Sequence, residues 1–585
     1  MAAKRLIVGI DYGTTYSGIS WVPNDGSDIQ DIAVVNMWPS KNGECKAPTR
    51  IAYAVENQQY QLDEDLWGYA VEPEFVACSW TKLLLDINTN ESQFDDPKLR
   101  EAIDQGILRL PFGKTPQQIC QDYLRQLYLH LMSQLQKKIP KSVIEATPMD
   151  CWLTVPAVWS DQAQNMTKMA AQAAGFGARR GDTISVISEP EAAAIAALKR
   201  YMRDGNLNPP QAGEDIMICD CGGGTVDITS YSLKALSPQL VFEELCVGAG
   251  GKCGATFLDR NLLELMKTRF GMSFQRVPLK ERSPGSEFLA AWENAKRNFS
   301  ETGPRRPVGL GPIPISGVHP EDWYDSERRK VLITRDDIRG IFDPVVDQVL
   351  RLVHSQIDAV KGFNHSIDRL ILIGGFGESP YLLSKLRDDR RIRRENIQVY
   401  GAEQSQSAVV LGAALRGLQG TAPRKKRCRR HYGVSLQMPF RQGLDPEDKS
   451  RKTNWNNEKM CRGRMKWIIF KGEEIEHGTT KTAELTFDPK KGDVTGTTVS
   501  LFSCALDLPP EYEWNERVKA VGQITVYWTK DELKKFESKR NHYFGPKTFL
   551  LKFSLTVNFG SEGGLLEVRT VVDGKVCGTT TMTFE

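Results

Sequence analysis

Two distant stretches of the chain repeat the same order of apolar and polar positions. LIVGIDYGTTYSGISWV begins at Leu6, and IMICDCGGGTVDITSYSL begins at Ile216. In each, an apolar run ends at an aspartate, a turn rich in glycine and threonine follows, and a second apolar run begins. This order is typical of a β-hairpin. Because it occurs twice, the sequence predicts an internally duplicated fold with a carboxylate at each bend.

The segments around these hairpins alternate between helical patterns and short apolar strands. WLTVPAVW, from Trp152, and LILIGG, from Leu370, are strand-like runs that lie between helical stretches. Such alternation is typical of an α/β architecture. Together with the duplicated hairpin, it predicts a two-lobed α/β domain over residues 1–420.

The pattern changes after Gly420. TAPRKKRCRRH is a basic, proline-containing run, which we interpret as a solvated linker over residues 421–431. A nuclear import signal and a patch for an acidic partner are the alternatives for this run. Beyond it, LKFSLTVNF alternates apolar and polar residues from Leu551, and the glycines of GSEGG, residues 560–564, predict a sharp hairpin turn. The sequence therefore predicts a separate β-sandwich domain over residues 432–585.

Composition narrows the classes of function. A chain of 585 residues is too long for one hydrophobic core, so at least two domains are expected. Lysine and arginine number 76 against 73 aspartates and glutamates, which gives a formal net charge of +3. This near balance gives no general reason to expect binding to nucleic acid or to a membrane surface.

The cysteines and the N-terminal segment bear on the compartment. Twelve cysteines are scattered from Cys45 to Cys577 without a paired framework, so reduced thiols are expected. The apolar part of MAAKRLIVGIDYG is too short for a signal peptide, and no stretch approaches the length of a membrane span. We expect a cytoplasmic protein, with a nuclear location as the alternative.

The two turns offer the chemical groups that bind phosphate. Backbone N–H groups of glycine-rich turns and threonine hydroxyls hold phosphate oxygens, and carboxylates direct a divalent cation and its water ligands. Each turn alone is equally well an ordinary hairpin whose aspartate caps the turn. Two copies in one chain favour a phosphate clamp built from Gly13, Thr14 and Thr15 beside Asp11, and from Gly222, Gly223, Gly224 and Thr225 beside Asp220 and Asp227.

Three further motifs extend this set. VISEPEAAAIAAL places Glu189 at the start of a helix, where the following proline fits the first turn. LILIGGFGESP ends a strand at Gly374 and Gly375, which allow close approach of a planar base. SEFLAAWENAKRNFSE places four polar residues at helical spacing on one face: Glu293, Lys296, Arg297 and Ser300. Taken alone, the three motifs are also explained as a helix start, a strand-to-helix turn and a solvated ion-paired face.

Two other patterns are interpreted as structural. Gly113-Lys114-Thr115 looks like the end of a P-loop, but Leu108 stands where that loop requires glycine, so the match is a coincidence. Cys219 and Cys221 flank Asp220, but on a strand they share the face opposite to it. We therefore predict buried strand thiols rather than metal ligands.

The motifs occur in the order of the ATPase unit shared by actin, sugar kinases and the seventy-kilodalton heat-shock chaperones. The sequence closely resembles the heat-shock chaperone family over most of residues 1–420. The match runs through GIDYGTTYSG, LTVPAVWSDQAQ, SEPEAAAIAAL, DCGGGTVDIT, ENAKRNFS and IGGFGESP. A looser resemblance to the family's β-sandwich substrate domain runs through MKWIIFKGEEIEHGTT and FSLTVNFGSEGGLLEVRTVVDGK. Together, the two resemblances imply an actin-like, ribonuclease H-like ATPase domain followed by a β-sandwich.

The resemblance implies roles for the residues that match. Glu189 is expected to position the attacking water, Lys82 in WTKLLLD to be the catalytic lysine, and Pro156 to act as a switch between lobes. For Lys82 the alternative is an exposed helix lysine. Thr225 is expected to take part in catalysis, and Asp11, Asp220 and Asp227 to organise Mg²⁺ and its waters. The nucleotide ATP or ADP is expected to be held by Gly13, Thr14, Thr15, Tyr16, Gly222, Gly223, Gly224, Glu293, Lys296, Arg297, Ser300, Gly374 and Gly375.

The chain also departs from the family pattern. Phe376 and Glu378 stand where the family's adenine loop carries a serine and an arginine, so a guanidinium that would stack on the base is missing. PRKKRCRRHYG replaces the apolar interdomain linker, and we expect no helical lid after the β domain. The pattern is most similar to the divergent, lidless branch of the family.

These observations predict a chaperone of the heat-shock type that binds ATP, hydrolyses it to ADP and phosphate, and acts on protein or peptide clients. A nucleotide-exchange partner is expected, and neither nucleic acid nor membrane. One rival is a nucleotide-gated binding or scaffold protein with little turnover, which Phe376, Glu378 and the changed linker favour. The others are an actin-like filament protein, which the appended β domain argues against, and a small-molecule phosphotransferase, for which no further base or sugar pocket is identifiable.

Overall fold

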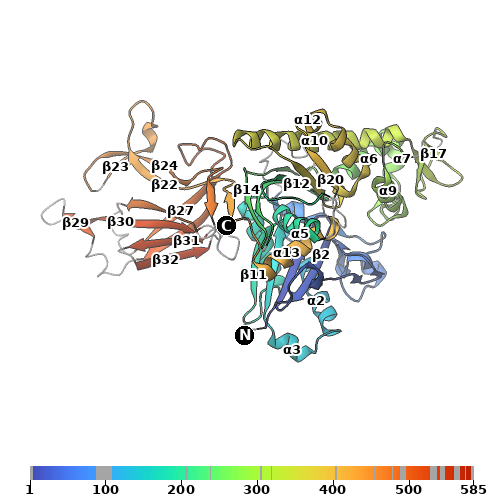
Figure 1. Cartoon of the computed structure of the whole chain (residues 1–585), viewed down its shortest axis with the longest axis horizontal. Coiled ribbons are helices and arrows are strands. Elements are labelled where there is room, and N and C mark those ends of the chain that lie inside the picture. The colour runs from blue at the N-terminus through green and yellow to red at the C-terminus, as the bar shows by residue number, and fades with distance from the viewer. Residues whose placement is uncertain are drawn as a thin grey trace. The chain divides into compact units, whose positions relative to one another are not determined.

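The chain divides into two compact units, Met1–Pro423 and Arg424–Glu585 (Figure 1). The computed structural model describes residues 4–86, 109–203, 208–237, 239–303, 306–317, 319–401, 405–453, 455–476, 479–487, 496–527, 536–540, 547–558, 567–572 and 575–581. The GSEGG turn predicted for residues 560–564 lies outside the described residues.

The first unit contains two sheets with the same strand order. One sheet runs β11-β10-β1-β2-β3, and the other, taken in the equivalent direction, runs β20-β19-β12-β13-β14. In each, an antiparallel hairpin, β1–β2 or β12–β13, is continued by parallel pairing on the side of its first strand. The predicted internal duplication is confirmed. The strands are β1 (Leu6–Asp11), β2 (Tyr16–Pro23), β3 (Ala33–Val34), β10 (Met149–Val155), β11 (Thr183–Ser188), β12 (Asp215–Cys221), β13 (Val226–Ala235), β14 (Val241–Glu244), β19 (Arg369–Ile373) and β20 (Gln398–Gly401).

Two helices join the two sheets through one apolar core. α5 (Glu189–Arg203) and α13 (Ser405–Gln419) share a buried cluster with residues of both sheets, including Ile7 of β1 and Ile218 of β12. The alanine run of α5 permits close helix packing, since small side chains let the backbones approach. A Cβ added at Gly412 of α13 would lie 1.7 Å from the carbonyl oxygen of Ala192. The lobes therefore meet at a tight helix pair beneath the two hairpins.

Some of the remaining helices cover the outer faces of the two sheets, and others pack beside a smaller sheet of the second lobe (Figure 1). On the first lobe they bury apolar side chains such as Leu127 and Ala170 against β1 and β10, and on the second lobe Leu258 and Phe342 pack against β12 and β19. They are α2 (Pro116–Gln136), α3 (Lys141–Ala146), α4 (Asp161–Ala174), α6 (Thr256–Phe270), α7 (Met272–Gln275), α8 (Leu279–Arg282), α9 (Glu287–Asn298), α10 (Arg335–Gly362), α11 (Pro380–Asp388) and α12 (Arg390–Arg394), with the short 3₁₀ helix η5 (Thr81–Asp86) beside α2 and α4.

Smaller strands complete the first unit. β6 (Ala47–Pro48) pairs with β2, and β15 (Ala249–Gly251) pairs with β13, so each hairpin carries one extra short strand near its turn. Two small sheets are formed by β7 (Arg50–Ala52) with β8 (Leu66–Trp67) and β9 (Cys78–Ser79), and by β16 (Val308–Leu310) with β17 (Tyr324–Asp325) and β18 (Lys330–Ile333); β4 (Met37–Trp38) pairs with β5 (Lys41–Asn42).

Two large antiparallel sheets around a common core make up most of the second unit. One sheet runs β23-β24-β22-β27-β28, and the other runs β26-β30-β31-β32, with β29 paired to β30. Val434 and Leu501 of the first sheet share a buried cluster with Leu485 and Leu555 of the second. The strands are β22 (His431–Pro439), β23 (Ser450–Lys452), β24 (Lys459–Ile469), β26 (Thr480–Phe487), β27 (Gly496–Cys504), β28 (Lys519–Tyr527), β29 (Glu537–Arg540), β30 (Lys547–Asn558), β31 (Glu567–Val572) and β32 (Lys575–Thr581).

The basic segment differs from the predicted linker. Lys425–Arg427 form β21, which pairs antiparallel with β25 (Glu474–Glu476) in the second unit. The Lys425 ammonium lies 2.6 Å from a carboxylate oxygen of Glu474, and the Arg427 guanidinium lies 3.3 Å from the other. The basic side chains therefore meet acidic partners on the adjacent strand, and this pairing holds the segment in the fold instead of leaving it solvated.

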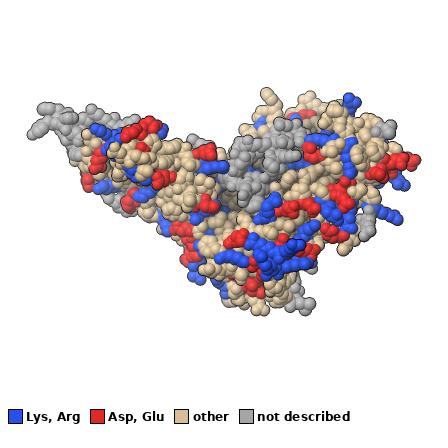
Figure 2. All heavy atoms as spheres, turned by 90° about the horizontal axis from the view of Figure 1, so that it is seen from above, with Lys and Arg blue, Asp and Glu red and all other residues tan. Residues whose placement is uncertain are grey.

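The surface charge agrees with the composition. Figure 2 shows basic and acidic side chains interspersed over the visible face. No helix in the described parts of the chain has the length and apolar character needed to cross a membrane.

Candidate nucleotide-binding site

The two predicted phosphate turns lie in contact with each other. A Cβ added at Gly223 would lie 2.2 Å from Oγ1 of Thr15, and one added at Gly224 would lie 2.4 Å from Oγ1 of Thr14. The second turn is closed by a 2.9 Å hydrogen bond from the Gly222 N–H to the Thr225 carbonyl. Only glycine at 223 and 224 lets the two turns approach so closely.

Both turns are held from behind through their carbonyl groups. In the second turn, the N–H groups of Gly254, Ala255 and Thr256 at the start of α6 donate to the carbonyls of Gly224, Gly222 and Gly223 at 2.8–3.2 Å. A trans peptide points its N–H away from its C=O. The amides that follow these carbonyls therefore face away from α6, where an anion could accept from them.

The first turn is supported in the same manner by Thr49. Its N–H donates to the Thr15 carbonyl at 2.8 Å, and its hydroxyl donates to the Gly13 carbonyl, also at 2.8 Å. Thr49 follows β6, whose pairing with β2 fixes this support. Hydrogen bonds within the protein therefore fix the backbone of both turns.

Buried carboxylates gather at the bends of the hairpins. Asp11, Asp220 and Asp227 are each at most 5% exposed. Burial raises the pKa of Asp220 well above its usual range, and the neighbouring charges of Glu189 and Asp227 raise it further. The Asp227 carboxylate also accepts from the Val158 N–H at 3.2 Å, which links the second hairpin to the loop after β10. Oxygen-only donors of high charge density favour a hard cation such as Mg²⁺.

The geometry indicates how such a cation would be held. Among the described residues, no three His, Cys, Asp or Glu side chains stand close enough to bind a metal ion directly. Mg²⁺ usually keeps several waters and takes only one or two carboxylates together with phosphate oxygens. The three aspartates therefore fit a role in which they hold the water ligands of Mg²⁺ while a bound nucleotide completes the coordination.

Lys82 and Glu189 form a buried ion pair beside these carboxylates. Lys82 Nζ donates to Glu189 Oε1 at 2.6 Å, and the two side chains are 1% and 13% exposed. The Lys82 ammonium also lies 5.1 Å from the ring centroid of Trp159, within cation–π range. The alternative of an exposed helix lysine is therefore wrong. Glu189 is the first residue of α5, as its helix-start motif predicts.

The surroundings of Glu189 raise its pKa to about 7. Burial is the largest influence and raises the pKa, the Lys82 ammonium lowers it, and the charges of Asp11 and Asp227 raise it. A carboxylate with a pKa near the working pH is suited to accept a proton from water.

A second lysine at the site was not predicted from the sequence. Lys46 Nζ lies 2.5 Å from Asp11 Oδ2. Lys46 belongs to no recognised motif, and the pairing of β6 with β2 brings it to the end of β1. No pattern in the sequence signals this contact.

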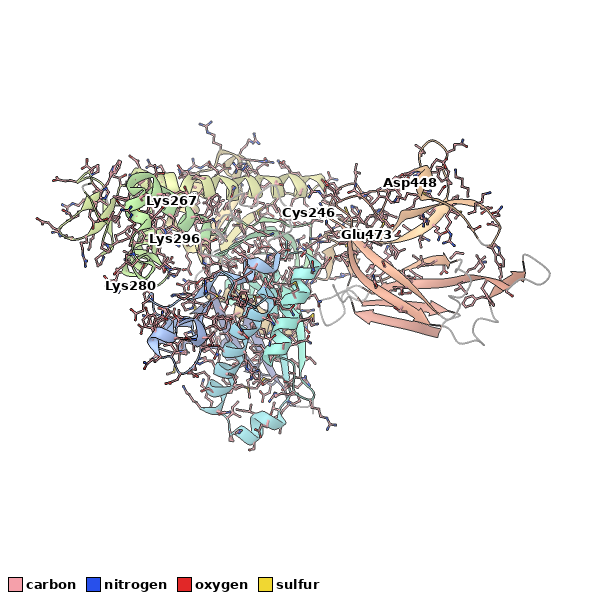
Figure 3. All side chains as sticks on the ribbon, turned by 180° about the vertical axis from the view of Figure 1, so that it is seen from behind. Cys246, Lys267, Lys280, Lys296, Asp448 and Glu473 are labelled. Carbon is pink, nitrogen blue, oxygen red and sulfur yellow. The ribbon has the colours of Figure 1, made fainter. Side chains whose placement is uncertain are left out.

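The polar residues of α9 lie beside the first turn. Lys296 forms ion pairs with Asp259 at 2.8 Å and with Glu293 at 2.7 Å, and Glu293 also binds Arg297 at 2.9 Å (Lys296 is labelled in Figure 3). Burial, followed by the charge of Glu293, raises the pKa of Tyr16, which places Tyr16 near this group. The turn after β1 and α9 therefore border the same region.

Ser300 differs from its predicted position. α9 ends at Asn298, and Phe299 has an extended backbone, so Ser300 lies beyond the helix and not on its face. The buried ring of Phe299 packs against Tyr381, with ring centroids 4.6 Å apart. This packing draws the chain away from the helix axis.

Comparison with known proteins identifies the family. The model of the family described as "Hsp70 protein" matches residues 110–425. The chain belongs to the Hsp70 family. It is 23% identical over 530 residues to heat shock 70 kDa protein 12B of Homo sapiens, covering 77% of this chain and 74% of that protein.

Two chaperone proteins DnaK are also similar. That of Thermoplasma acidophilum is 26% identical over 303 residues, which is 52% of this chain and 43% of that protein. That of Thermotoga petrophila is 24% identical over 431 residues, 72% of this chain and 61% of that protein. The chain thus spans less than two thirds of either DnaK. Hsp70 membership supports an ATP-binding, chaperone-like function and an actin-like ATPase fold followed by a β-rich region.

The two adjacent glycines in the turn after β19 have different surroundings. Gly374 has a φ of +85°, and a Cβ there would lie 2.4 Å from Asp220 Oδ1. A Cβ at Gly375 would meet nothing within 4 Å. Gly374 is therefore required by the backbone, whereas Gly375 faces open space.

The two residues that depart from the Hsp70 adenine loop have structural partners. Phe376 is 5% exposed and packs in the core near Phe342. The Glu378 carboxylate accepts from Ser405 Oγ at 2.9 Å and from Gln406 Nε2 at 2.7 Å, at the start of α13. A carboxylate cannot replace a stacking guanidinium, so this loop would offer a nucleotide base fewer contacts.

The two patterns interpreted as structural have structural surroundings. Lys114 binds Asp122 at 2.6 Å, and Thr115 caps the N-terminus of α2 by accepting from the Gln118 N–H at 3.2 Å. Cys219 and Cys221 are both buried, with their sulfur atoms 3.6 Å apart. The predicted buried thiols are confirmed.

Proposed function

We propose that this Hsp70-family protein binds Mg²⁺-ATP between its two hairpin turns, hydrolyses it to ADP and phosphate, and acts on protein or peptide clients. The observation that carries the proposal is the contact of two preformed glycine–threonine turns beside buried carboxylates and the Lys82–Glu189 pair. An ordinary hairpin turn does not need this combination.

In the proposed reaction, the N–H groups of both turns and the hydroxyls of Thr14, Thr15 and Thr225 bind the phosphate oxygens. A water oxygen forms a bond to the γ-phosphorus while the bond between that phosphorus and the bridging oxygen breaks. Glu189 orients this water and takes its proton, and the bridging oxygen leaves on ADP. The Lys82 ammonium holds Glu189 in place and neutralises charge that develops on the transferred group. Mg²⁺, when bound, would shield the phosphate charge, with its waters held by Asp11, Asp220 and Asp227.

Calorimetry with ADP and ATP in the presence of Mg²⁺, combined with single-turnover hydrolysis, tests the proposal. We expect saturable one-site binding of both nucleotides and release of one phosphate per ATP. Absence of binding would contradict the whole proposal. Binding without turnover would instead support the second candidate, a nucleotide-gated scaffold, which the lost base contacts at Phe376 and Glu378 favour.

Removal of the Lys82 charge should change the pH dependence of hydrolysis. Glu189 must be ionised to accept a proton, so the rate falls as the pH drops through its pKa. Lys82 lowers that pKa, while Asp11, Asp220 and Asp227 face the same group. Lys82→Met should therefore move the acid limb of the single-turnover rate to higher pH.

Lys141→Met is the matched control for this experiment, because Lys141 forms an exposed pair with Glu145 at 3.8 Å. Its pH profile should equal that of the wild type. An unchanged acid limb in Lys82→Met would show that Glu189 is not the titrating base.

Communication between the two units is expected to be weak. The segment that follows the first unit is basic, and Lys425 and Arg427 pair with Glu474 in the second unit. It offers little apolar surface that could bind differently in two nucleotide states, and a ligand shifts an equilibrium only through such a difference. Residues 1–423 alone should hydrolyse ATP at about the full-length rate.

Peptide affinity of the full chain with ATP and with ADP, measured by fluorescence anisotropy, tests the same expectation. The two affinities should agree closely. A tenfold difference, about 1.4 kcal/mol of coupling, would show that the units communicate.

A further inference from the structure

Lys46 places an ammonium group beside the buried aspartates of the site. Its ammonium lies 2.5 Å from Asp11 Oδ2, and the two side chains are 17% and 4% exposed. Lys82 pairs with Glu189, whereas Lys46 pairs with Asp11 at the end of β1. Neither the phosphate motifs nor the proposed hydrolysis gives Lys46 a role.

The backbone and the stem of Lys46 are fixed independently of its charge. Its carbonyl accepts from the Tyr69 hydroxyl at 3.2 Å. Its stem lies against the backbone of β2, since a Cβ at Gly18 would be 3.2 Å from Lys46 Cγ. Three residues later, Thr49 holds the carbonyls of the first phosphate turn. One short segment therefore supports the turn and places an ammonium group beside it.

The contact with Asp11 leaves part of the hydrogen-bonding capacity of this ammonium group unused. An ammonium has three N–H donors, and one carboxylate oxygen does not use them all. The remaining N–H groups of Lys46 can therefore donate to a second acceptor beside the first turn.

We propose that Lys46 is a phosphate-binding residue whose tethered charge takes over part of the neutralisation that a divalent cation supplies to the bound nucleotide. The inference rests on the proposed function, because it assigns the ligand of the same site. The phosphates of a nucleoside diphosphate such as ADP would be repelled by the carboxylates of Asp11, Asp220 and Asp227 unless cations are present. Lys46 bridges Asp11 and a phosphate oxygen, so the protein should hold ADP even when Mg²⁺ is removed.

Calorimetric titration of the full chain with ADP, in Mg²⁺ and in excess EDTA, tests this assignment. For the wild type we expect a loss of affinity of less than tenfold on removal of Mg²⁺. For Lys46→Met, which keeps the length of the side chain and removes its charge, we expect a loss of at least a hundredfold in EDTA. Most of that loss should be recovered in Mg²⁺.

Two further variants complete the experiment. Lys46→Arg keeps the charge and should retain binding in EDTA. Lys41→Met removes an exposed lysine of β5 in the same segment and should behave as the wild type.

The inference would be overturned if the wild type lost tenfold or more in ADP affinity on removal of Mg²⁺, or if Lys46→Met kept the wild-type ratio of affinities. The wild-type ratio decides the matter even if Lys46→Met fails to fold. Absence of ADP binding by the wild type in Mg²⁺ would instead overturn the proposed function, and this inference with it.

Discussion

Glu189→Gln should lower the single-turnover rate of ATP hydrolysis by ~10²-fold or more while leaving ATP affinity nearly unchanged. Glutamine keeps the shape of the side chain and an oxygen for the Lys82 ammonium, which lies 2.6 Å from Glu189 Oε1 in the wild type. It cannot take a proton from water. Because a water-orienting carboxylate acts mainly in the transition state, the effect should fall on the rate and not on binding.

Glu287→Gln is a suitable control for this variant. Glu287 is also a glutamate in the first turn of a helix, α9, but it is exposed. Its variant should hydrolyse ATP at the wild-type rate. A Glu189→Gln protein with wild-type turnover would refute the role given to Glu189, and Glu189→Ala should lose turnover in the same way.

Gly223→Val should abolish nucleotide binding, with a loss of affinity of more than ~10²-fold. A Cβ at this position would lie 2.2 Å from Oγ1 of Thr15, so the two turns cannot keep their present contact. Separation of the turns removes the shared amide and hydroxyl donors for phosphate. Calorimetry with ADP measures the effect, and thermal unfolding reports whether the fold survives.

Gly340→Val provides the comparison for the second variant. A Cβ at this exposed position of α10 meets nothing within 4 Å, and its backbone is helical. This protein should bind ADP as the wild type does. Equal ADP affinity in the Gly223→Val protein and the wild type would show that phosphate does not bind at these turns.

Local sequence patterns predicted the parts of the fold that depend on neighbours in the chain. The two hairpins, the helix that begins at Glu189 and the buried cysteines on either side of Asp220 all follow from the spacing of apolar residues, glycine and proline. A strand or turn is set largely by which side chains must be buried and which backbone angles glycine permits. The duplication could be predicted for the same reason, because both copies have the same order of apolar strand, aspartate and glycine-rich turn.

Errors arose where a segment's partner lies elsewhere in the chain. The basic run was predicted to be solvated because its own composition favours water, whereas Lys425–Arg427 form a strand against Glu474–Glu476. Ser300 has helical spacing from Glu293, but packing of Phe299 against Tyr381 ends the helix before it. Neither partner can be identified from the segment itself.

The spacing of apolar residues and glycines was enough to predict two lobes, a pair of glycine–threonine turns and the carboxylates beside them. Which charges meet depends on the folded chain, which pairs Lys82 with Glu189 and Lys46 with Asp11. Burial makes these pairings strong, because a charge removed from water needs a close partner, and that partner is set by how strands and helices distant in the chain pack together. Motif spacing describes the turns, but the electrostatics of the site depend on contacts between segments far apart in the sequence.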